Sequence, residues 1–221
     1  MSDCTYINNI FTKHMTEKID IIFECGSRDA IDSLKMFDFY QPKKIFCFEC
    51  NPDSVNICRD NIGDNKNIIL IDKAVSNTDG EIYFYATDMD KSSDKNIGAS
   101  SALLHLDNKN SFFQKKINVK SITLKTFMEE NEITDIDLLC LDLQGYEKFA
   151  LEGLGEKIKN IKYIISEISF TSYYSGDTLF DDYKTFLKNL GFDFIDFISY
   201  GGFGDALFIN NKLTTIVNEN I

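Results

Sequence analysis

The chain has 221 residues, of which 43% are hydrophobic and 13% aromatic, so it is long and apolar enough for one α/β domain with a full core. A net charge of −12 and an isoelectric point near 4.6 disfavour binding to the phosphate backbone of nucleic acid or to an anionic membrane surface. No apolar stretch is long enough to span a bilayer, and the first twenty residues lack the pattern of a secretory signal peptide.

The cysteines follow no disulfide spacing, and several of them lie inside apolar runs. We therefore expect reduced thiols in a cytoplasmic protein, in the cytoplasm of the host if the chain is viral. A single C-x-x-C pair lies within a predicted strand and has no second pair nearby, which argues against a zinc site. The residues concerned are Cys4, Cys25, Cys47, Cys50, Cys58 and Cys140.

In the first half of the chain, short apolar runs alternate with stretches of helical spacing. We predict a short leading helix over 4–16, strands over 19–24, 43–50 and 67–75, and helices over 29–40 and 53–62. The turn "NTDG" at 77–80 separates "KAVS" from "EIYFYAT" and predicts a hairpin-like pair there. Residues 88–111 are polar and are predicted to form a long loop, which in a compact domain is usually functional or disordered.

The second half continues the alternation and ends in two neighbouring strands. We predict strands over 116–124, 136–143 and 162–169, helices over 125–131, 146–158 and 178–191, and a final hairpin of 192–198 with 205–210. Alternating strands and helices favour a doubly wound, mostly parallel, Rossmann-like sheet, here closed by an antiparallel hairpin. We expect an N-terminal extension over 1–18 and a single domain over 19–221, with ligands bound where the parallel strands end.

The first strand is followed by a glycine turn, in the stretch "IDIIFECGSRDAIDS". A dinucleotide site would use G-x-G-x-x-G, which is absent, and Glu24 and Asp29 would repel a diphosphate. S-adenosylmethionine carries no phosphate, and its methionine part is cationic at the ammonium and the sulfonium. The Gly26 turn suits it, with Ser27, backbone N–H groups and Arg28 available to its carboxylate. The alternative is a solvated helix N-terminus, where acidic residues are favourable in any protein.

The second and third strands also end in polar residues. Glu49 follows the glycine turn by about twenty residues, where an acid can accept hydrogen bonds from both ribose hydroxyls. NAD and S-adenosylmethionine share that requirement. After the third strand, Asp72 is available to the adenine amino group, and Ala74 can pack on the adenine ring.

Two further acids follow buried strands, in "LCLDLQGYE" and "IISEIS". Asp142 and Glu167 are expected at the same sheet edge, where one carboxylate raises the pKa of the other and makes a proton acceptor. They are equally suited to hold a divalent metal ion, and Asp142 has the alternative role of capping the next helix. His105, in the long loop, is a third candidate base or an ordinary loop histidine.

Seven stretches together resemble the FkbM-type methyltransferases, in order and spacing, from about Ile19 to Asn210. They are "FECGSRDAIDS", "FCFECNPDS", "DKAVSNTDGEIYFY", "GASSALL", "ITLKTFMEE", "IDLLCLDLQGYEKFALEG" and "ISEIS". The resemblance implies a class I methyltransferase sheet and an S-adenosylmethionine-dependent O-methyltransferase acting on a hydroxyl of a sugar or glycan-like acceptor. Three positions depart from the family pattern: Glu24 replaces an Asp, Ala30 replaces a second glycine, and Gln144 replaces a frequent Glu. The last departure weakens a carboxylate-rich metal site.

These observations give one set of expectations for the site. The cofactor is expected to contact Glu24, Gly26, Ser27, Asp29, Glu49, Asn51, Asp72, Lys73, Ala74 and Asp142. The catalytic candidates are Asp142, Glu167 and His105. A divalent metal ion is left open without being predicted, the partner is a small molecule or glycan rather than nucleic acid or membrane, and no oligomeric state is assigned. Two alternatives remain: a non-catalytic binding module with this fold, and an NAD-dependent oxidoreductase.

Overall fold

A computed structural model describes residues 4–93, 96–107 and 112–213. Residues 94–95 and 108–111 of the predicted loop therefore lie outside the described residues. The same holds for residues 1–3 of the predicted extension and residues 214–221 of the predicted domain.

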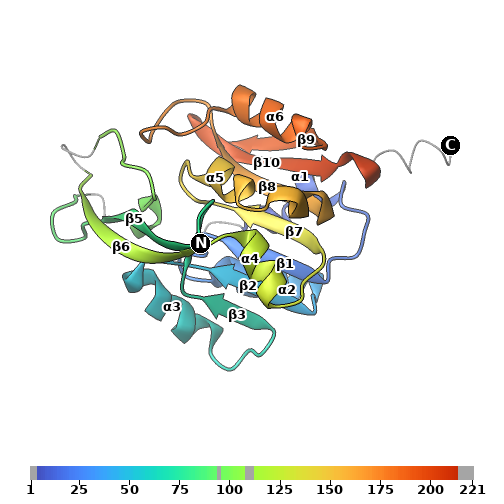
Figure 1. The fold of residues 1–221 in the computed structure, drawn as a ribbon, viewed down its shortest axis with the longest axis horizontal. Coiled ribbons are helices and arrows are strands. Elements are labelled where there is room, and N and C mark those ends of the chain that lie inside the picture. Colours follow the sequence, from blue (N-terminus) through green and yellow to red (C-terminus); the bar gives the residue numbers. More distant parts are fainter. Residues whose placement is uncertain (1–3, 94–95, 108–111, 214–221) are drawn as a thin grey trace.

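Within the described residues, the large sheet has seven strands in the order β3-β2-β1-β7-β8-β10-β9 (Figure 1). The strands are β1 Ile21–Cys25, β2 Lys44–Phe48, β3 Ile68–Ile71, β7 Ile136–Leu141, β8 Ile161–Ser169, β9 Phe192–Ser199 and β10 Phe203–Asn210. The first five in spatial order are parallel, whereas β10 is antiparallel to both β8 and β9. The predicted doubly wound sheet and its closing hairpin are confirmed.

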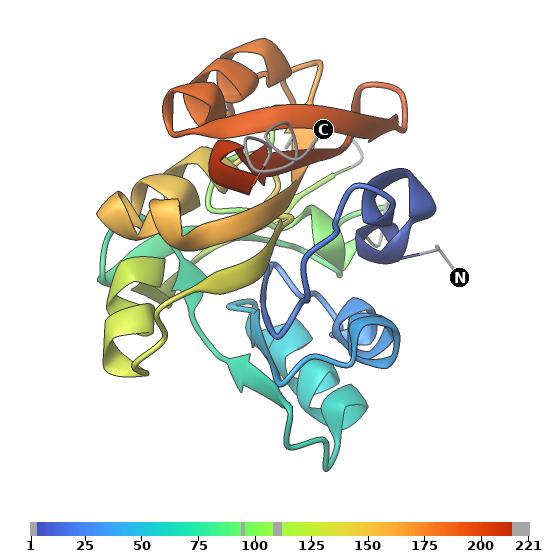
Figure 2. The ribbon, with the colours of Figure 1, turned by 90° about the vertical axis from the view of Figure 1, so that its right-hand side faces the viewer.

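Helices cover both faces of this sheet, and each face has its own core (Figure 2). One face carries η1 Thr5–Ile7, α1 Asn9–Thr12, α2 Ile31–Tyr40 and α3 Pro52–Ile62; the other carries α4 Leu124–Glu130, α5 Glu147–Glu152, η3 Gly155–Asn160 and α6 Phe180–Asn189. Successive strand residues alternate between the two cores, as Ile22 and Phe23 do in β1. This two-sided burial explains why the central strands read as continuous apolar runs.

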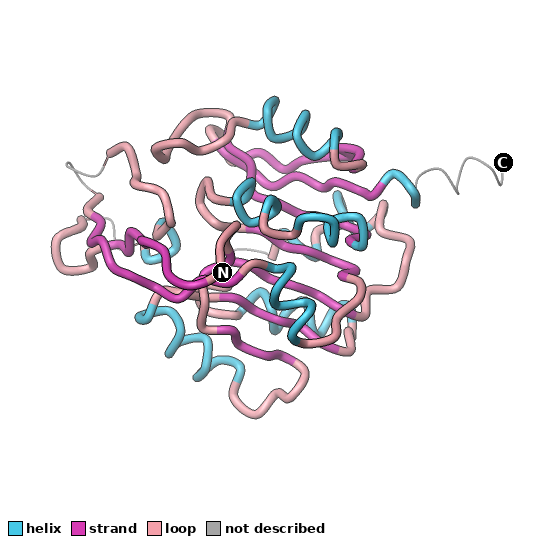
Figure 3. The backbone as a smooth tube through the Cα atoms, in the orientation of Figure 1, coloured by secondary structure: helices cyan, strands magenta, loops and turns pink. Residues whose placement is uncertain are grey.

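A second sheet lies on the side of the large sheet where its parallel strands end (Figure 3). It contains β4 Ala74–Val75, β5 Gly80–Thr87 and β6 Gln114–Ile122 in the order β4-β6-β5, and the short helix η2 Ile97–Ala99 packs near β5. The strand predicted over 67–75 therefore divides between two sheets. The predicted hairpin of "KAVS" with "EIYFYAT" is wrong, because β6 lies between β4 and β5 and pairs with both.

Two predicted helices are shorter or broken in the structure. The leading helix over 4–16 is reduced to η1 and α1, where the Asn8 side chain caps α1 and Phe11 is fully buried in the core on the α2 face. The helix predicted over 146–158 divides into α5 and η3 around Gly153 and Leu154. Among the described residues, the helices are too short or too polar to cross a bilayer.

Candidate functional site

A cavity of about 460 Å³ lies where β1, β2, β7 and β8 end, and the small sheet with segment 96–107 forms its other wall. Its size is typical of pockets for cofactors and small molecules. The predicted site residues that line it are Gly26, Glu49, Asn51, Lys73, Ala74, His105, Asp142 and Glu167. Those that lie outside its lining are Glu24, Ser27, Asp29 and Asp72.

The turn after β1 is packed against the end of β7. Gly26 has φ +91°, and a Cβ atom there would lie 1.9 Å from the backbone oxygen of Asp142, so only glycine fits. The N–H groups of Gly26 and Ser27 donate to the Phe48 oxygen, at 3.0 and 3.1 Å. Those two N–H groups are therefore already used within the chain, and Arg28 is the residue of this turn whose cationic side chain lines the cavity.

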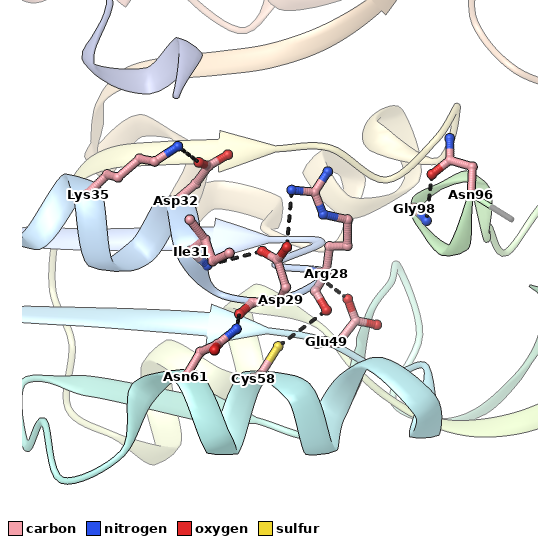
Figure 4. Close-up of polar contacts among 10 residues, drawn as sticks. All are labelled: Arg28, Asp29, Ile31, Asp32, Lys35, Glu49, Cys58, Asn61, Asn96 and Gly98. Atoms are coloured by element: carbon pink, nitrogen blue, oxygen red, sulfur yellow. Dashed lines mark hydrogen bonds and ion pairs between the residues drawn. The ribbon is translucent and has the colours of Figure 1, made fainter. Parts of the chain in front are cut away.

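Figure 4 shows how this turn is held, and where its acidic residues lie. Asp29 accepts a hydrogen bond from the Ile31 N–H and forms an ion pair with Arg28 at 3.3 Å, while Asp32 pairs with Lys35 in the first turn of α2. These two acids occupy the helix N-terminus, as the alternative interpretation of the sequence expected. The neighbouring loop packs on the same turn, since a Cβ on Gly98 would lie 3.2 Å from the Arg28 Cδ.

Glu24 lies behind the turn rather than in the cavity. Its side chain points to the α2 face, where the hydroxyl of Ser33 donates to its carboxylate, and only 2% of the residue is exposed. Burial raises the pKa of Glu24 to about 8, against the lowering effect of the Ser33 hydrogen bond. Ser27 supports the same region, because its hydroxyl donates to the Glu24 backbone oxygen at 3.2 Å.

Glu49, the first residue after β2, forms part of the cavity wall. Its carboxylate accepts three backbone N–H groups, from Arg28 at 2.8 Å, Cys50 at 2.8 Å and Asn51 at 2.7 Å. Burial nevertheless raises the pKa of Glu49, since it outweighs these bonds. The three bonds orient the carboxylate at the tip of β2 and tie the β1 turn to the start of α3, which the Asn51 side chain caps.

Of the three cofactor-binding residues predicted after β3, two line the cavity. Lys73 and Ala74 line it, whereas Asp72 is exposed and forms an ion pair with Arg59 at 3.2 Å. The division of the predicted strand between two sheets places Ala74 against the cavity.

Segment 96–107 is anchored to its surroundings by backbone pairing. Tyr85 pairs with Ser101 and His105 with Tyr174, each as an isolated antiparallel bridge. The Ser101 hydroxyl lies 2.8 Å from the Gln144 backbone oxygen, to which it donates. This part of the predicted loop thus forms a wall of the cavity that is fixed to β5, to the loop after β7 and to the loop after β8.

His105 is held in one tautomer by its neighbours. Its Nδ1 accepts a hydrogen bond from the Asp107 N–H at 3.0 Å, so the neutral ring carries its proton on Nε2. Burial lowers the pKa of His105, against the opposing effect of Asp107. The ring also packs on Phe112 and Tyr174, at centroid distances of 4.7 and 5.0 Å. The arrangement makes His105 a hydrogen-bond donor more readily than a base.

Asp142 and Glu167, from the ends of β7 and β8, are joined by the side chain of Gln144. The Gln144 Nε2 donates to Asp142 Oδ1 at 2.7 Å and to Glu167 Oε2 at 2.9 Å. Burial raises the pKa of both carboxyl groups, and the pKa of Glu167 is further raised by the nearby charge of Asp142. Two linked carboxylates of this kind are candidates to accept a proton from a bound molecule.

Gln144 and Ser101 support the site, although the sequence alone does not indicate this role for either residue. The available signals are the stretches "LDLQGYE" and "GASSALL", which contain them. As for metals, the described residues contain no group of three or more His, Cys, Asp or Glu side chains arranged to hold an ion.

Comparison with known proteins finds a matching family model and a similar sequence. The model of the methyltransferase FkbM domain matches residues 24–194. The 2-O-methyltransferase NoeI of Sinorhizobium fredii (strain NBRC 101917 / NGR234) is 27% identical over 205 residues, which is 90% of this chain and 83% of that protein.

Solved structures share the fold at low identity. A methyltransferase FkbM from Methylobacillus flagellatus KT has a TM-score of 0.55 at 10% identity, covering 87% of this chain and 44% of that one. M. capricolum TrmK, in complex with S-adenosyl-homocysteine, has a TM-score of 0.52 at 14% identity, covering 96% and 69%. The family match covers most of the chain. The chain therefore belongs to the FkbM methyltransferase family, whose methyl donor is S-adenosylmethionine.

Proposed function

We propose that this protein transfers the methyl group of S-adenosylmethionine to a hydroxyl group of a sugar or glycan-like acceptor. The observation that carries the proposal is one continuous cavity with Glu49 at the tip of β2 and a linked pair of carboxylates, Asp142 just after β7 and Glu167 near the end of β8. The first suits the ribose of a nucleoside, and the second suits removal of a proton from an acceptor.

The residues that line the cavity fit this donor. Glu49 has its carboxylate fixed by three N–H groups and is assigned to the ribose hydroxyls. Arg28 is assigned to the methionine carboxylate, because the nearby N–H groups of Gly26 and Ser27 are already bonded. Lys73 and Ala74 are assigned to the adenine end. The lining residues Gly26 and Asn51 shape the same wall, whereas Glu24, Ser27, Asp29 and Asp72 would act indirectly, by stabilising the turns.

Proton removal is the step that the protein itself must provide. The bound donor supplies a methyl group on a positively charged sulfur, which a hydroxyl oxygen attacks poorly while it keeps its proton. Asp142 is the first candidate to accept that proton and Glu167 the second, because both line the cavity and burial raises the pKa of both carboxyl groups. His105 ranks third, since its Nδ1 already accepts the Asp107 N–H.

The acceptor end of the cavity supports a sugar. Tyr146, Tyr173 and Tyr174 line the same cavity as the two carboxylates, and we assign their aromatic rings to a sugar face. A relative named as a 2-O-methyltransferase supports oxygen as the methylated atom. The net charge of −12 disfavours a nucleic acid acceptor.

Cofactor binding provides the first test. Calorimetry should detect binding of S-adenosylmethionine to the wild-type chain, and Glu49→Gln should weaken it at least about tenfold, since hydrogen bonds to a charged group contribute about 1.5–3 kcal/mol. Glu49→Ala should weaken it further. Glu129→Ala, an exposed acid on α4, is the matched control and should bind as the wild type does. Equal affinity in all four proteins would show that the ribose assignment is wrong.

Methyl transfer provides the second test. The purified chain is incubated with S-adenosylmethionine carrying a labelled methyl group and a broad panel of glycans, and the products are analysed by mass spectrometry. A methyl ether on a sugar hydroxyl is the expected product, and Asp142→Asn should reduce its formation by about 100-fold or more. Tight cofactor binding without transfer to any acceptor would instead favour the non-catalytic binding module. A response to nicotinamide cofactors would favour the oxidoreductase.

We also propose a cytoplasmic location. All six cysteines are free in the structure, and five of them are buried. Unpaired thiols in this number are typical of a reducing compartment.

A further inference from the structure

Gln144 occupies the point where the two carboxylates of the site meet. Its Nε2 lies 2.7 Å from Asp142 Oδ1 and 2.9 Å from Glu167 Oε2. An amide nitrogen has two N–H donors, so one atom can bond both carboxylates, whereas an amide oxygen in that place would face two acceptors. The nitrogen therefore bridges the side chain of Asp142, just after β7, and that of Glu167 in the neighbouring strand β8.

A tyrosine hydroxyl lies on the other side of this amide. The Tyr174 hydroxyl is 2.7 Å from the Gln144 Oε1 and 3.1 Å from the Ala99 backbone oxygen. Donation to Oε1 marks that atom as the carbonyl oxygen and keeps the nitrogen turned toward the acids. The tyrosine itself is fixed, because the Asp177 carboxylate accepts its backbone N–H at 3.0 Å and only 5% of the residue is exposed.

The backbone of Gln144 has an unusual conformation that directs its side chain. Its φ is +53°, in the left-handed region that residues other than glycine rarely adopt. The conformation is held from both sides: the Glu147 carboxylate accepts the N–H groups of Leu143 at 2.8 Å and Gly145 at 3.2 Å, and Ser101 donates to the Gln144 oxygen. Such over-determined strain is typical of functional positions.

The surroundings of the acid pair are mostly negative. The charged or titratable groups that interact electrostatically with Asp142 or Glu167 are Tyr6, Arg28, Asp32, Glu49, Glu147, Tyr174 and Asp205. Arg28 is the cation in this set, and burial together with the acids raises the pKa of both carboxyl groups. The Gln144 hydrogen bonds lower it. Within the described residues, Asp142 Oδ2 and Glu167 Oε1 make no hydrogen bond. Each carboxylate therefore has one oxygen available to the hydroxyl group of a bound substrate.

We propose that Gln144 is a positioning residue for this acid pair, whose two amide N–H groups hold the Asp142 and Glu167 carboxylates side by side while Tyr174 keeps the amide nitrogen facing them. The role of this acid pair in catalysis rests on the proposed function. A glutamate at this position would remove both donors and add a third negative charge. The glutamine thus takes the place between the carboxylates that a proton or a cation would otherwise fill.

A titration of the cofactor-free full chain tests the bridge without any acceptor. Carboxyl ¹³C chemical shifts of Asp142 and Glu167, assigned with Asp142→Asn and Glu167→Gln, are followed against pH by NMR. Gln144→Leu should raise the apparent pKa values of the pair by at least about one unit, and Gln144→Glu should raise them further. Tyr174→Phe should shift them less, in the same direction. Gln41→Glu adds a charge at an exposed position and should shift them by less than about 0.2 unit.

Methyl transfer gives the second readout. Gln144→Leu should lower kcat about tenfold or more and move the pH–rate profile upward, with the Kd for S-adenosylmethionine within about twofold of the wild type. Unchanged titration and an unchanged pH–rate profile in a folded Gln144→Leu chain would overturn the inference and leave the proposed function standing. A wild-type chain that methylates nothing would remove the function, while the titration would still decide the bridge. If Gln144→Leu does not fold, Tyr174→Phe decides it by the same measurements.

Discussion

The turn after β1 depends on the absence of a side chain at Gly26. Gly26→Ala would bring a Cβ atom to 1.9 Å from the Asp142 backbone oxygen, at a residue with φ +91°. Because the clash is with backbone, either β1 or β7 must move. We expect a loss of unfolding free energy on the order of 2–4 kcal/mol. Urea unfolding followed by circular dichroism, without cofactor, measures it.

Gly176→Ala provides the matched control for this prediction. Gly176 has φ +89°, almost the same as Gly26, but a Cβ atom there would meet nothing within 4 Å. This variant carries the backbone strain alone, and we expect a loss of about 1 kcal/mol. Equal losses in the two variants would mean that the close approach of β7 contributes nothing.

At the scale of single residues, the sequence located the tips of strands better than the direction of side chains. Glu49 was predicted at a strand tip and lies there, because β2 ends at Phe48. Glu24 was predicted at the tip of a strand ending at residue 24, but β1 runs to Cys25, so the two-residue alternation turns Glu24 toward α2. The role of Gln144 could not be predicted, since it depends on a left-handed backbone and on Tyr174, thirty residues later.

Among the elements, the alternation of strand and helix was sufficient for the parallel sheet, because parallel neighbours require crossover connections. The pairing around Asn77–Gly80 was not predictable in the same way. The turn is real, but Ala74 and Gly80 both pair with Ser121, so β6 enters between them. Local turn chemistry indicates where the chain reverses. Which strands pair is decided by β6, which comes much later in the sequence.

The start of α4 offers a prediction about an element. The Thr123 side chain accepts the Thr126 N–H at 3.1 Å, and its own N–H donates to Asp79 at 2.7 Å, which ties the helix to the turn before β5. Thr123→Ala removes the cap and should reduce the unfolding free energy by about 1 kcal/mol, and up to about 2. Thr123→Ser keeps the hydroxyl and should lose less than half as much. A serine variant as unstable as the alanine variant would contradict the capping role.

For the whole molecule, buried carboxyl groups govern how stability depends on pH. Burial raises the pKa of Glu24 to about 8, of Glu147 to about 7 and of Asp205 to about 6, from ordinary values of 4.5, 4.5 and 3.8. Between its unfolded and folded pKa values, each group is more protonated in the folded chain than in the unfolded one. Their contribution is complete below about pH 4 and is lost as the pH rises to about 8.

We therefore expect the urea midpoint of unfolding to fall from pH 5.5 to pH 8, with an unchanged slope of free energy against urea. Repulsion within a chain of net charge −12 could produce a similar trend. Salt separates the two causes, because about 0.5 M sodium chloride screens surface repulsion but hardly reaches buried groups. Disappearance of the fall in salt would assign it to the surface.

Glu24→Gln isolates the group with the highest of these three pKa values. The amide oxygen can still accept from the Ser33 hydroxyl, so the contact with α2 is kept while the titration is removed. Since the wild-type carboxyl group ionises around pH 8, the variant should lose less stability than the wild type between pH 6.5 and 8.5.

Glu129→Gln, exposed on α4, provides the control and should follow the wild-type curve of stability against pH. The comparison is between slopes within each protein, so a uniform change of stability in the variant does not affect it. If the stabilities of Glu24→Gln and the wild type fell in parallel, Glu24 would already be ionised in the folded chain, and burial would not raise its pKa to about 8.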